Sequence, residues 1–355
     1  MRGIKLGVVG LGHRGQAMFS LATKLPGVEA AALCDNAPAA LSKGLEAHPG
    51  ARAFDNYDEM LEKGGLDALL VETPGDNHAA FCAKALARGL NVMSDVPCVF
   101  NYSEAELLWA AERDSSGMFM FGANPNMWGF VQTAVDLKSQ GLLGTPYYLE
   151  AEYIHSLPEL SETTPWRKKL CCIKYCTHSL GPLLRLVDDD IVKVCCLGSG
   201  APLSGYPDYH DAMCAIFHTA SNAVIRLTIS FRNHFKGGCH SYRVFGTEGC
   251  FERFSGRGAV AAPLTLFNSE KLTGAECATV LNVHEMSPRY AHKAEASGHG
   301  GADYALLDNF FAAIRDGRPS PLSLREGLRM SLPGVFAAES AAKGGELVKV
   351  TYPWS

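Results

Sequence analysis

The 355-residue sequence has no apolar run near the ~18–20 residues that a membrane-spanning helix requires. Charge of one sign is not in excess either, since charged residues make up 19% of the chain and the formal net charge is −5. This balance gives no reason to expect nucleic acid or a membrane surface as a partner. The first residues run directly into an apolar strand, without the layout of a signal peptide. We therefore expect a cytoplasmic globular protein with two domains.

Cysteine is plentiful, with 12 in the chain, but the spacings of a metal site are missing. The adjacent pairs Cys171-Cys172 and Cys195-Cys196 are not Cys-x-x-Cys chelates, and no second pair completes a zinc set. Most of the others lie in apolar runs, where a free cysteine behaves as a small hydrophobe. We predict reduced, mostly buried thiols, as is typical of a reducing compartment.

The first third of the chain contains a strand, a glycine-rich turn and a helix in immediate succession. Residues 4–9 are β-rich, residues 10–15 read G-L-G-H-R-G, and a helical stretch covers residues 16–25. In the G-x-G-x-x-G pattern the glycines allow a tight turn, close approach of a pyrophosphate and close helix–strand packing. The helix amides then face the phosphates. The predicted phosphate-binding residues are Gly10, Gly12, His13, Arg14 and Gly15.

An acid follows the second predicted strand at the distance expected for a dinucleotide site. Residues 30–34 lead into Asp35, which is 20 residues after Gly15. A carboxylate at this position accepts hydrogen bonds from ribose hydroxyls and repels a 2′-phosphate, so NAD is favoured over NADP. We therefore predict NAD as the cofactor.

Strands and helices continue to alternate up to residue 123. Residues 66–71, 91–94 and 118–121 are predicted strands, with a helix over residues 79–88. Because loops at the carboxyl ends of parallel strands line the cofactor crevice, contacts near the nicotinamide are predicted for Thr73, Pro74 and His78. The predicted fold class is α/β, with a Rossmann doubly wound parallel sheet over residues 1–123.

The remaining residues, 124–355, show a different pattern. Residues 223–229 alternate apolar and polar side chains, and residues 243–249 have the composition of a hairpin strand and its turn. We predict a second, α+β domain with a large, mostly antiparallel open sheet that binds the substrate. A sheet face of this kind often needs a partner, so we expect by analogy a homo-oligomer, either a dimer or a tetramer.

Three segments together resemble the glucose-fructose oxidoreductase, inositol dehydrogenase and MocA (Gfo/Idh/MocA) superfamily. They are the G-x-G-x-x-G turn, the T-P-x-x-x-H loop at residues 73–78 and the x-x-P segment Asp95-Val96-Pro97. The resemblance implies a Rossmann domain paired with a larger domain whose open sheet supplies substrate residues and an oligomer surface. Dehydrogenases of this kind carry Glu-Lys-Pro, in which the lysine exchanges a proton with a substrate hydroxyl. Here an apolar valine, Val96, replaces that lysine.

Further blocks are E-Y-I-H at residues 152–155, W-R at 166–167 and Y-C-T-H-S-L-G-P at 175–182, of which the first and the last are the specific ones. Together these blocks resemble the NAD-dependent α-N-acetylgalactosaminidase family of glycoside hydrolases. The resemblance implies that the sugar meets Tyr153, Arg167, Tyr175 and His178. It also implies that the cofactor touches Asp95, Val96 and Asn126. In that family the x-x-P segment is Glu-Val-Pro, so its glutamate is one methylene longer than Asp95, and its sugar-contacting tyrosine segment is not found around residues 235–240.

The chemistry implied is a glycoside hydrolysis in which NAD is used transiently. Oxidation at carbon 3 acidifies the hydrogen on carbon 2, a base removes it, carbon 1 expels its leaving group, water adds, and the hydride returns. Such a site needs proton-exchanging groups and donors that hold an enolate. Tyr175 and His178 share a face on a helical turn, and Tyr153 and His155 point the same way along a strand. The predicted substrate-binding residues are Glu152, His155, Trp166 and Arg167.

A histidine near the end of the chain is a further catalytic candidate. His299 lies between glycines in G-H-G-G, which is a poor setting for core packing and permits close approach of a substrate. Asp303 can cap or charge-stabilise the helix that follows. We predict Tyr153, Tyr175, His178 and His299 as catalytic residues and no metal. An alternative is that His155 and His299 hold a metal ion together with Glu152.

Two other functions compete with the glycosidase. A net NAD-dependent sugar or cyclitol dehydrogenase would use a tyrosine or histidine in place of the missing lysine and would form NADH stoichiometrically. A non-catalytic dinucleotide-binding sensor would not need the polar aromatic and imidazole groups between residues 153 and 178. We therefore predict the glycosidase.

Overall fold

The computed structural model describes residues 3–156, 164–168, 170–206, 208–234, 238–256, 262–274, 276–283, 289–290 and 298–355. The chain forms two compact units. The first comprises Met1–Asn124, His292–Leu328 and Trp354, and the second comprises Pro125–Ala291, Arg329–Pro353 and Ser355. The N-terminal part of the first unit ends at Asn124, next to the predicted boundary at residue 123. The first unit also includes His292–Leu328, a segment that the predicted division assigns to the second domain.

The first unit contains a six-stranded parallel sheet in the order β3-β2-β1-β4-β5-β6. The strands are β1 (Ile4–Val9), β2 (Val28–Cys34), β3 (Arg52–Phe54), β4 (Ala68–Val71), β5 (Asn91–Ser94) and β6 (Phe119–Phe121). The strand order reverses between β1 and β4, and ligands of such sheets bind outside the carboxyl ends of the strands at that point. The predicted Rossmann sheet is confirmed.

Six helices and the start of a seventh accompany this sheet in the described part of the first unit: α1 (His13–Ala22), α2 (Pro38–Ala47), α3 (Tyr57–Lys63), α4 (His78–Leu86), α5 (Tyr102–Arg113), α10 (Ala302–Asp316) and the first turn of α11 (Leu324–Ala342). Helix α1 begins three residues before the predicted start, because the last residues of the glycine motif form its first turn. Helix α10 packs against α1 and buries Leu306, Leu307, Phe310 and Phe311. This packing explains why the segment belongs to the first unit.

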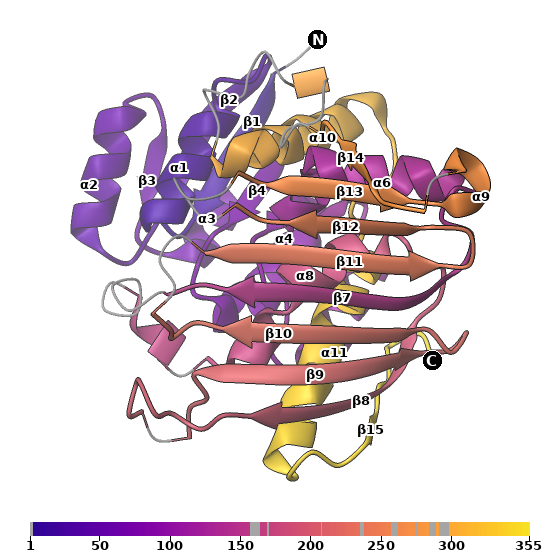
Figure 1. The fold of residues 1–355 in the computed structure, drawn as a ribbon. Helices are drawn as coiled ribbons and strands as arrows, with labels where there is room; N and C mark the ends of the chain where they lie inside the picture. The colour runs from indigo at the N-terminus through magenta and orange to yellow at the C-terminus, as the bar shows by residue number, and fades with distance from the viewer. Residues whose placement is uncertain are drawn as a thin grey trace. The chain divides into compact units, whose positions relative to one another are not determined.

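The second unit contains a nine-stranded sheet in the order β14-β13-β12-β11-β7-β10-β9-β8-β15 (Figure 1). The strands are β7 (Pro146–Ile154), β8 (Ile191–Gly198), β9 (Ala212–Thr219), β10 (Val224–Ser230), β11 (Cys239–Gly246), β12 (Cys250–Phe254), β13 (Leu264–Asn268), β14 (Thr279–Leu281) and β15 (Val348–Lys349). Strand β10 pairs with β7 in parallel, and the other described pairs are antiparallel. The mostly antiparallel sheet is as predicted.

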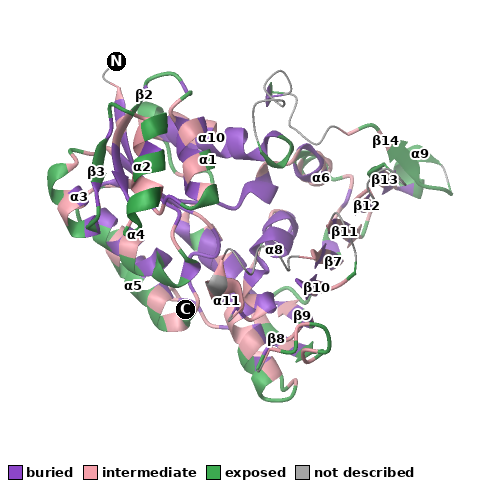
Figure 2. Ribbon diagram, turned by 90° about the vertical axis from the view of Figure 1, so that its left-hand side faces the viewer, coloured by how far each residue is buried: buried purple, intermediate pink, exposed green. Residues whose placement is uncertain are grey.

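In the described part of the second unit, helices cover one face of this sheet, and we call the opposite face the open face. Helix α8 (Thr177–Leu184) lies against β7 and β11, and α6 (Gly129–Ser139) and most of α11 lie on the same side (Figure 2). Short elements include η3 (Pro165–Lys168), η4 (Cys172–Tyr175) and α9 (Glu270–Thr273). Tyr153 of β7 is buried on the helix side, so its neighbour Glu152 faces the open side. Among the described helices, none is long and apolar enough to cross a membrane.

Candidate functional site

The glycine-rich turn of the first unit is shaped for close approach of a phosphate. Gly10 has φ +91°, and a Cβ there would lie 2.7 Å from the backbone of Glu72. A Cβ on Gly15 would lie 1.9 Å from the Gly10 carbonyl oxygen. Gly12 caps α1 without a side-chain hydrogen bond, and a Cβ there would have no atom within 4 Å. The amides of the first turn of α1 therefore border open space in which an anion fits.

Asp35 lies beside a cavity suited to the adenosine half of a dinucleotide. Its carboxylate accepts hydrogen bonds from the backbone N–H groups of Leu11 at 2.6 Å and Ala37 at 2.8 Å. The cavity has a volume of about 380 Å³, and Asp35, Asp55, Tyr57, Thr73 and Pro74 are among its lining residues. Two carboxylates here are unfavourable for a 2′-phosphate. The residues of this unit fit NAD.

Both ring nitrogens of His78 lie within hydrogen-bond distance of backbone carbonyl oxygens in two neighbouring loops. The ring is 1% exposed, with Nδ1 2.9 Å from the carbonyl oxygen of Pro97 and Nε2 2.8 Å from that of Thr73. The residue therefore connects the loop after β4 to the segment that contains Val96, which is itself buried. Its direct contact with a cofactor stays a prediction, as does that of His13.

Arg14, predicted to bind phosphate, lies among three acidic side chains of its own unit. Nη1 and Nη2 donate to the two oxygens of Asp303 at 2.7 and 2.9 Å, and Nε lies 3.5 Å from Asp95 and 4.0 Å from Glu72. Burial opposes the charge of Arg14, yet Asp95 and Asp303 raise its pKa above the usual range. The guanidinium is thus permanently charged and already held by the protein.

His299 and Asn124 complete this network. His299 Nδ1 lies 2.9 Å from Asp303 Oδ2, and Asn124 Nδ2 donates to Asp303 Oδ1 at 2.9 Å. The sequence predicts that Asp303 can cap or charge-stabilise the start of α10. It does lie in the first turn of α10, and its carboxylate also accepts hydrogen bonds from Arg14 and Asn124, which come from two distant segments of the chain.

Glu72 supplies a first prediction about stability. It is buried, and burial followed by the charge of Asp95 raises the pKa of its carboxyl, which Arg14 offsets only in part. The folded state therefore keeps a proton that the unfolded chain loses, so stability falls as pH rises above the unfolded-state pKa. Glu72→Gln is expected to raise Tm by about 2 °C at pH 8 and to change it little at pH 4.

Thermal unfolding at the two pH values checks this expectation. Glu62→Gln serves as a control, because the Glu62 side chain is 61% exposed. Equal effects of Glu72→Gln at pH 4 and pH 8 would contradict a protonated Glu72.

The second unit brings the predicted sugar-site residues into one aromatic–imidazole cluster, which we define as Tyr153, His155, Tyr175, His178, Phe231 and His240. The ring centroids of Tyr153 and His155 are 4.7 Å apart, and those of Tyr175 and His178 are 4.8 Å apart. The Tyr153 ring lies 5.7 Å from that of Tyr175 and 5.5 Å from that of His178. The two predicted pairs are therefore adjacent.

His240 is a member of the cluster that the sequence analysis missed. Its Nε2 lies 3.1 Å from Nε2 of His155, and its ring centroid is 4.6 Å from that of Tyr153. Strand register explains the contact, since His240 of β11 pairs with Tyr153 of β7. No short motif marks His240, and only the pairing of β7 with β11 places it there.

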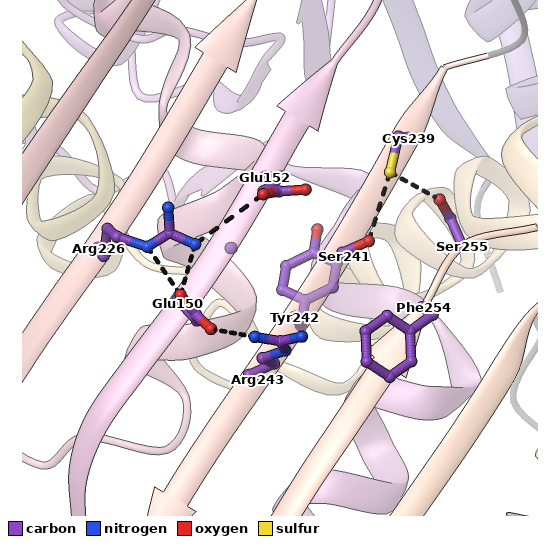
Figure 3. Close-up of a pocket in the computed structure, with 10 residues that line it drawn as sticks. Glu150, Glu152, Arg226, Cys239, Ser241, Tyr242, Arg243, Phe254 and Ser255 are labelled. Atoms are coloured by element: carbon purple, nitrogen blue, oxygen red, sulfur yellow. Dashed lines mark hydrogen bonds and ion pairs between the residues drawn. The ribbon is translucent and has the colours of Figure 1, made fainter.

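Arg167 and Trp166 lie beside this cluster, whereas Glu152 does not. The Arg167 guanidinium is 4.6 Å from the Trp166 ring and 5.5 Å from the Tyr175 ring. Glu152 points to the open face of the sheet, where its carboxylate is 3.9 Å from Arg226 (Figure 3). Among the described residues, no group of three His, Cys, Asp or Glu is arranged to hold a metal ion. In the alternative metal site of Glu152, His155 and His299, the carboxylate does not fit, because Glu152 faces away from the cluster that contains His155.

The open face carries a charged pocket of about 250 Å³ between β7, β10, β11 and β12 (Figure 3). Glu150 accepts hydrogen bonds from Arg226 and Arg243 at 2.7 and 2.8 Å. Burial opposes its charge, but the two arginines hold its pKa below the usual value. Exposed Leu197 and Ile216 lie on neighbouring strands. The predicted homo-oligomer stays a prediction.

The cysteines are free thiols, and seven of the 12 are buried. Near the cluster, burial raises the pKa of Cys176 to about 12 and that of Cys172 well above its usual value. Neither is a reactive thiolate at neutral pH.

Comparison with known families matches different parts of the chain to different domain models. Residues 4–123 match the model described as "Oxidoreductase family, NAD-binding Rossmann fold", and residues 131–252 match the "GFO/IDH/MocA C-terminal domain". The chain belongs to the Gfo/Idh/MocA family. Residues 209–352 of this family member also match the "Glycosyl hydrolase 109, C-terminal domain".

Relatives of this Gfo/Idh/MocA protein include glycosidases by name. A glycosyl hydrolase family 109 protein of Saccharopolyspora erythraea is 24% identical, over 96% of this chain and 81% of the relative. An α-N-acetylgalactosaminidase of Shewanella oneidensis is 23% identical, over 96% of this chain and 83% of the relative.

Solved structures share the fold. Levoglucosan dehydrogenase in complex with NADH and L-sorbose superposes with a TM-score of 0.85 at 17% identity, covering 99% of this chain and 100% of that one. An Agrobacterium radiobacter oxidoreductase in complex with NAD+, L-tartaric acid and magnesium gives 0.82 at 15% identity, covering 98% of both chains.

Proposed function

We propose that this protein is an NAD-dependent glycosidase that oxidises carbon 3 of its substrate transiently. The observation that carries the proposal is the aromatic–imidazole cluster, which gathers Tyr153, Tyr175 and His178 within ring contact of one another. The match to the glycosyl hydrolase 109 C-terminal domain supports it. So does Val96, an apolar residue where net dehydrogenases of the superfamily carry a proton-exchanging lysine.

The first unit is proposed to hold NAD through the glycine-rich turn and Asp35. Gly10, Gly12 and Gly15 leave room for the pyrophosphate, and Asp35 can exchange its backbone partners for ribose hydroxyls. When bound, NAD supplies a reversible hydride acceptor for carbon 3 of the sugar.

Tyr153 and Tyr175 are proposed to divide the proton chemistry between them. Burial, followed by the nearby Tyr175, raises the pKa of Tyr153 well above its usual value, and Arg167 offsets this only in part. Tyr153 therefore keeps its proton and donates a hydrogen bond to the enolate oxygen. Since two adjacent phenolates repel each other, Tyr175 is the tyrosine that takes the carbon 2 proton. The Arg167 guanidinium over its ring favours that charge.

Proton NMR of aryl α- and β-glycosides incubated with the protein in D₂O, without added NAD, tests this function. We expect free sugar that carries deuterium at carbon 2, with no net NADH. A 3-keto sugar with matching NADH would instead make the protein a net dehydrogenase. No reaction across the panel, with NAD still bound, would overturn the glycosidase and favour a sensor. As a control, Asp35→Arg should lose NAD and the deuterium incorporation together.

A further inference from the structure

One buried carboxylate in the first unit organises an exposed imidazole. Asp303 is 4% exposed and accepts hydrogen bonds from Arg14 and Asn124, while His299 Nδ1 lies 2.9 Å from its Oδ2. Burial disfavours its charge, but hydrogen bonds from His299 and Arg14 and the charge of Arg14 hold its pKa well below the usual range. Asp303 is therefore ionised at neutral pH and can only accept hydrogen bonds.

The state of Asp303 determines the tautomer of His299. Because an ionised carboxylate has no hydrogen to give, Nδ1 of His299 must carry one. In the neutral ring, Nε2 is then the basic nitrogen. A carboxylate that fixes the tautomer and orientation of a histidine in this way is the arrangement that makes an imidazole an efficient proton acceptor.

The backbone around His299 is shaped for this contact. His299 has φ +53°, a left-handed conformation unusual for a residue with a side chain, and is followed by Gly300 and Gly301 at φ +62° and +93°. A Cβ on Gly298 would lie 2.6 Å from Asp303 Oδ2. The His299 side chain is 53% exposed, so it contributes little to the core. The left-handed backbone conformation of His299 therefore orients an exposed ring and not a packed core side chain.

Arg14 places this pair at the carboxyl edge of the parallel sheet. Besides Asp303, the guanidinium faces Asp95 directly after β5 and Glu72 directly after β4. This edge is the one at which open α/β sheets bind their ligands. Asp95 adjoins Val96, so a single arginine touches both the Asp303–His299 pair and the segment that lacks a lysine.

We propose that His299, oriented by Asp303 and Arg14, takes the proton of the substrate's carbon 3 hydroxyl, the task for which Val96 has no suitable atom. The inference rests on the proposed function. When bound, NAD would supply the acceptor for the hydride that leaves carbon 3 with the electron pair of the breaking C3–H bond. The O–H bond breaks with its proton going to Nε2, and the carbon 3 carbonyl forms. On re-reduction, Nε2 returns the proton. Asp303 and Arg14 are positioning residues.

The orientation of His299 can be measured without turnover. In protein labelled with ¹⁵N at the histidine rings, the His299 resonances are expected to report the Nδ1–H tautomer. Asp303→Asn is expected to redistribute that tautomer, and Asp303→Glu to restore it in part. The resonances are assigned with His299→Gln. A His299 ring in the Nε2–H form in the wild type would overturn the proposal.

Kinetics test the proton transfer. His299→Gln is expected to lower kcat at least ~10²-fold with little change in KM or in NAD affinity measured by calorimetry, and His299→Gly to regain activity with added imidazole. The control His48→Gln should stay within about twofold of the wild type, because the His48 ring contacts Ser20 and the Phe19 ring, and neither residue has a role in the proposed site. A kcat within about threefold of the wild type for His299→Gln would refute the assignment.

Two readouts separate this inference from the glycosidase itself. If carbon 2 exchange occurs in the wild type and persists in His299→Gln, the inference fails and the glycosidase stands. If the wild type shows no carbon 2 exchange but reduces NAD with a sugar, and His299→Gln abolishes that reduction, the glycosidase fails and the role of His299 stands.

Discussion

With Tyr175→Phe, turnover of the glycoside is expected to fall at least ~10²-fold, the low end for removal of a positioned acid–base group. The substitution removes only the hydroxyl. The ring remains able to pack against His178, Tyr153 and Phe231, whose centroids lie 4.8, 5.7 and 5.5 Å away. A loss of activity with an unchanged unfolding temperature would therefore report chemistry rather than folding.

Tyr242→Phe is the matched control for this experiment. Tyr242 is also a buried tyrosine of the second unit, and its hydroxyl donates to the carbonyl oxygen of His178 at 2.8 Å. Loss of that bond is expected to cost about 1 kcal/mol of stability and to lower kcat less than tenfold. Steady-state kinetics and thermal unfolding of both variants decide the matter. Equal turnover in Tyr175→Phe and the wild type would remove Tyr175 from the mechanism.

Local sequence signals were sufficient for the first unit up to residue 123. Its strands follow apolar runs, and its ligand-binding turn follows a motif in which each glycine has a separate steric reason. The strand 91–94 was predicted with its observed bounds, and Asp35 directly follows β2 as expected. The ends of several other predicted strands and helices moved by one to three residues, as with α1, whose first turn is already part of the motif.

The sequence alone could not predict that α10 belongs to the first unit. Its apolar positions predict an amphipathic helix, but they do not specify the surface that the helix covers. The same limitation hid the link between Arg14 and Asp303, which are 289 residues apart. The phosphate-binding motif already explains an arginine next to its last glycine. No local sequence pattern therefore indicated that Arg14 pairs with a distant carboxylate.

The sugar-side cluster shows what strand register adds to sequence pattern. Tyr153 and His155 lie two apart on one strand, so alternation alone was enough to put them on one face. The same alternation places Glu152 on the opposite face, away from the predicted substrate residues, although it lies between them in sequence. His240 joins from another strand, and its position depends on which residue of β11 pairs with Tyr153.

Two substitutions that each add one methyl group, Gly12→Ala and Gly15→Ala, distinguish an effect on NAD binding from an effect on the stability of the Rossmann unit. Gly12→Ala places a methyl group where no protein atom lies within 4 Å, and its backbone at φ −62° suits alanine. The protein alone should lose only the cap preference of glycine over alanine, about 0.5–1 kcal/mol. If the pyrophosphate approaches the backbone at this residue, the same methyl group should lower NAD affinity at least ~10-fold.

Gly15→Ala places an equal methyl group 1.9 Å from the Gly10 carbonyl oxygen, so α1 must move away from the turn. Overpacking of this kind is expected to destabilise the protein by about 3 kcal/mol. Thermal unfolding with and without NAD distinguishes the two variants, because a ligand at free concentration L that binds the folded state stabilises it by RT ln(1 + L/Kd) and so raises Tm less when its affinity is lower. Gly12→Ala should lower the Tm of the free protein only slightly and reduce the rise that NAD causes, whereas Gly15→Ala should lower Tm strongly under both conditions. A full NAD-induced rise in Gly12→Ala would mean that the dinucleotide does not pass over this turn, and the cofactor half of the proposed site would have to be placed elsewhere.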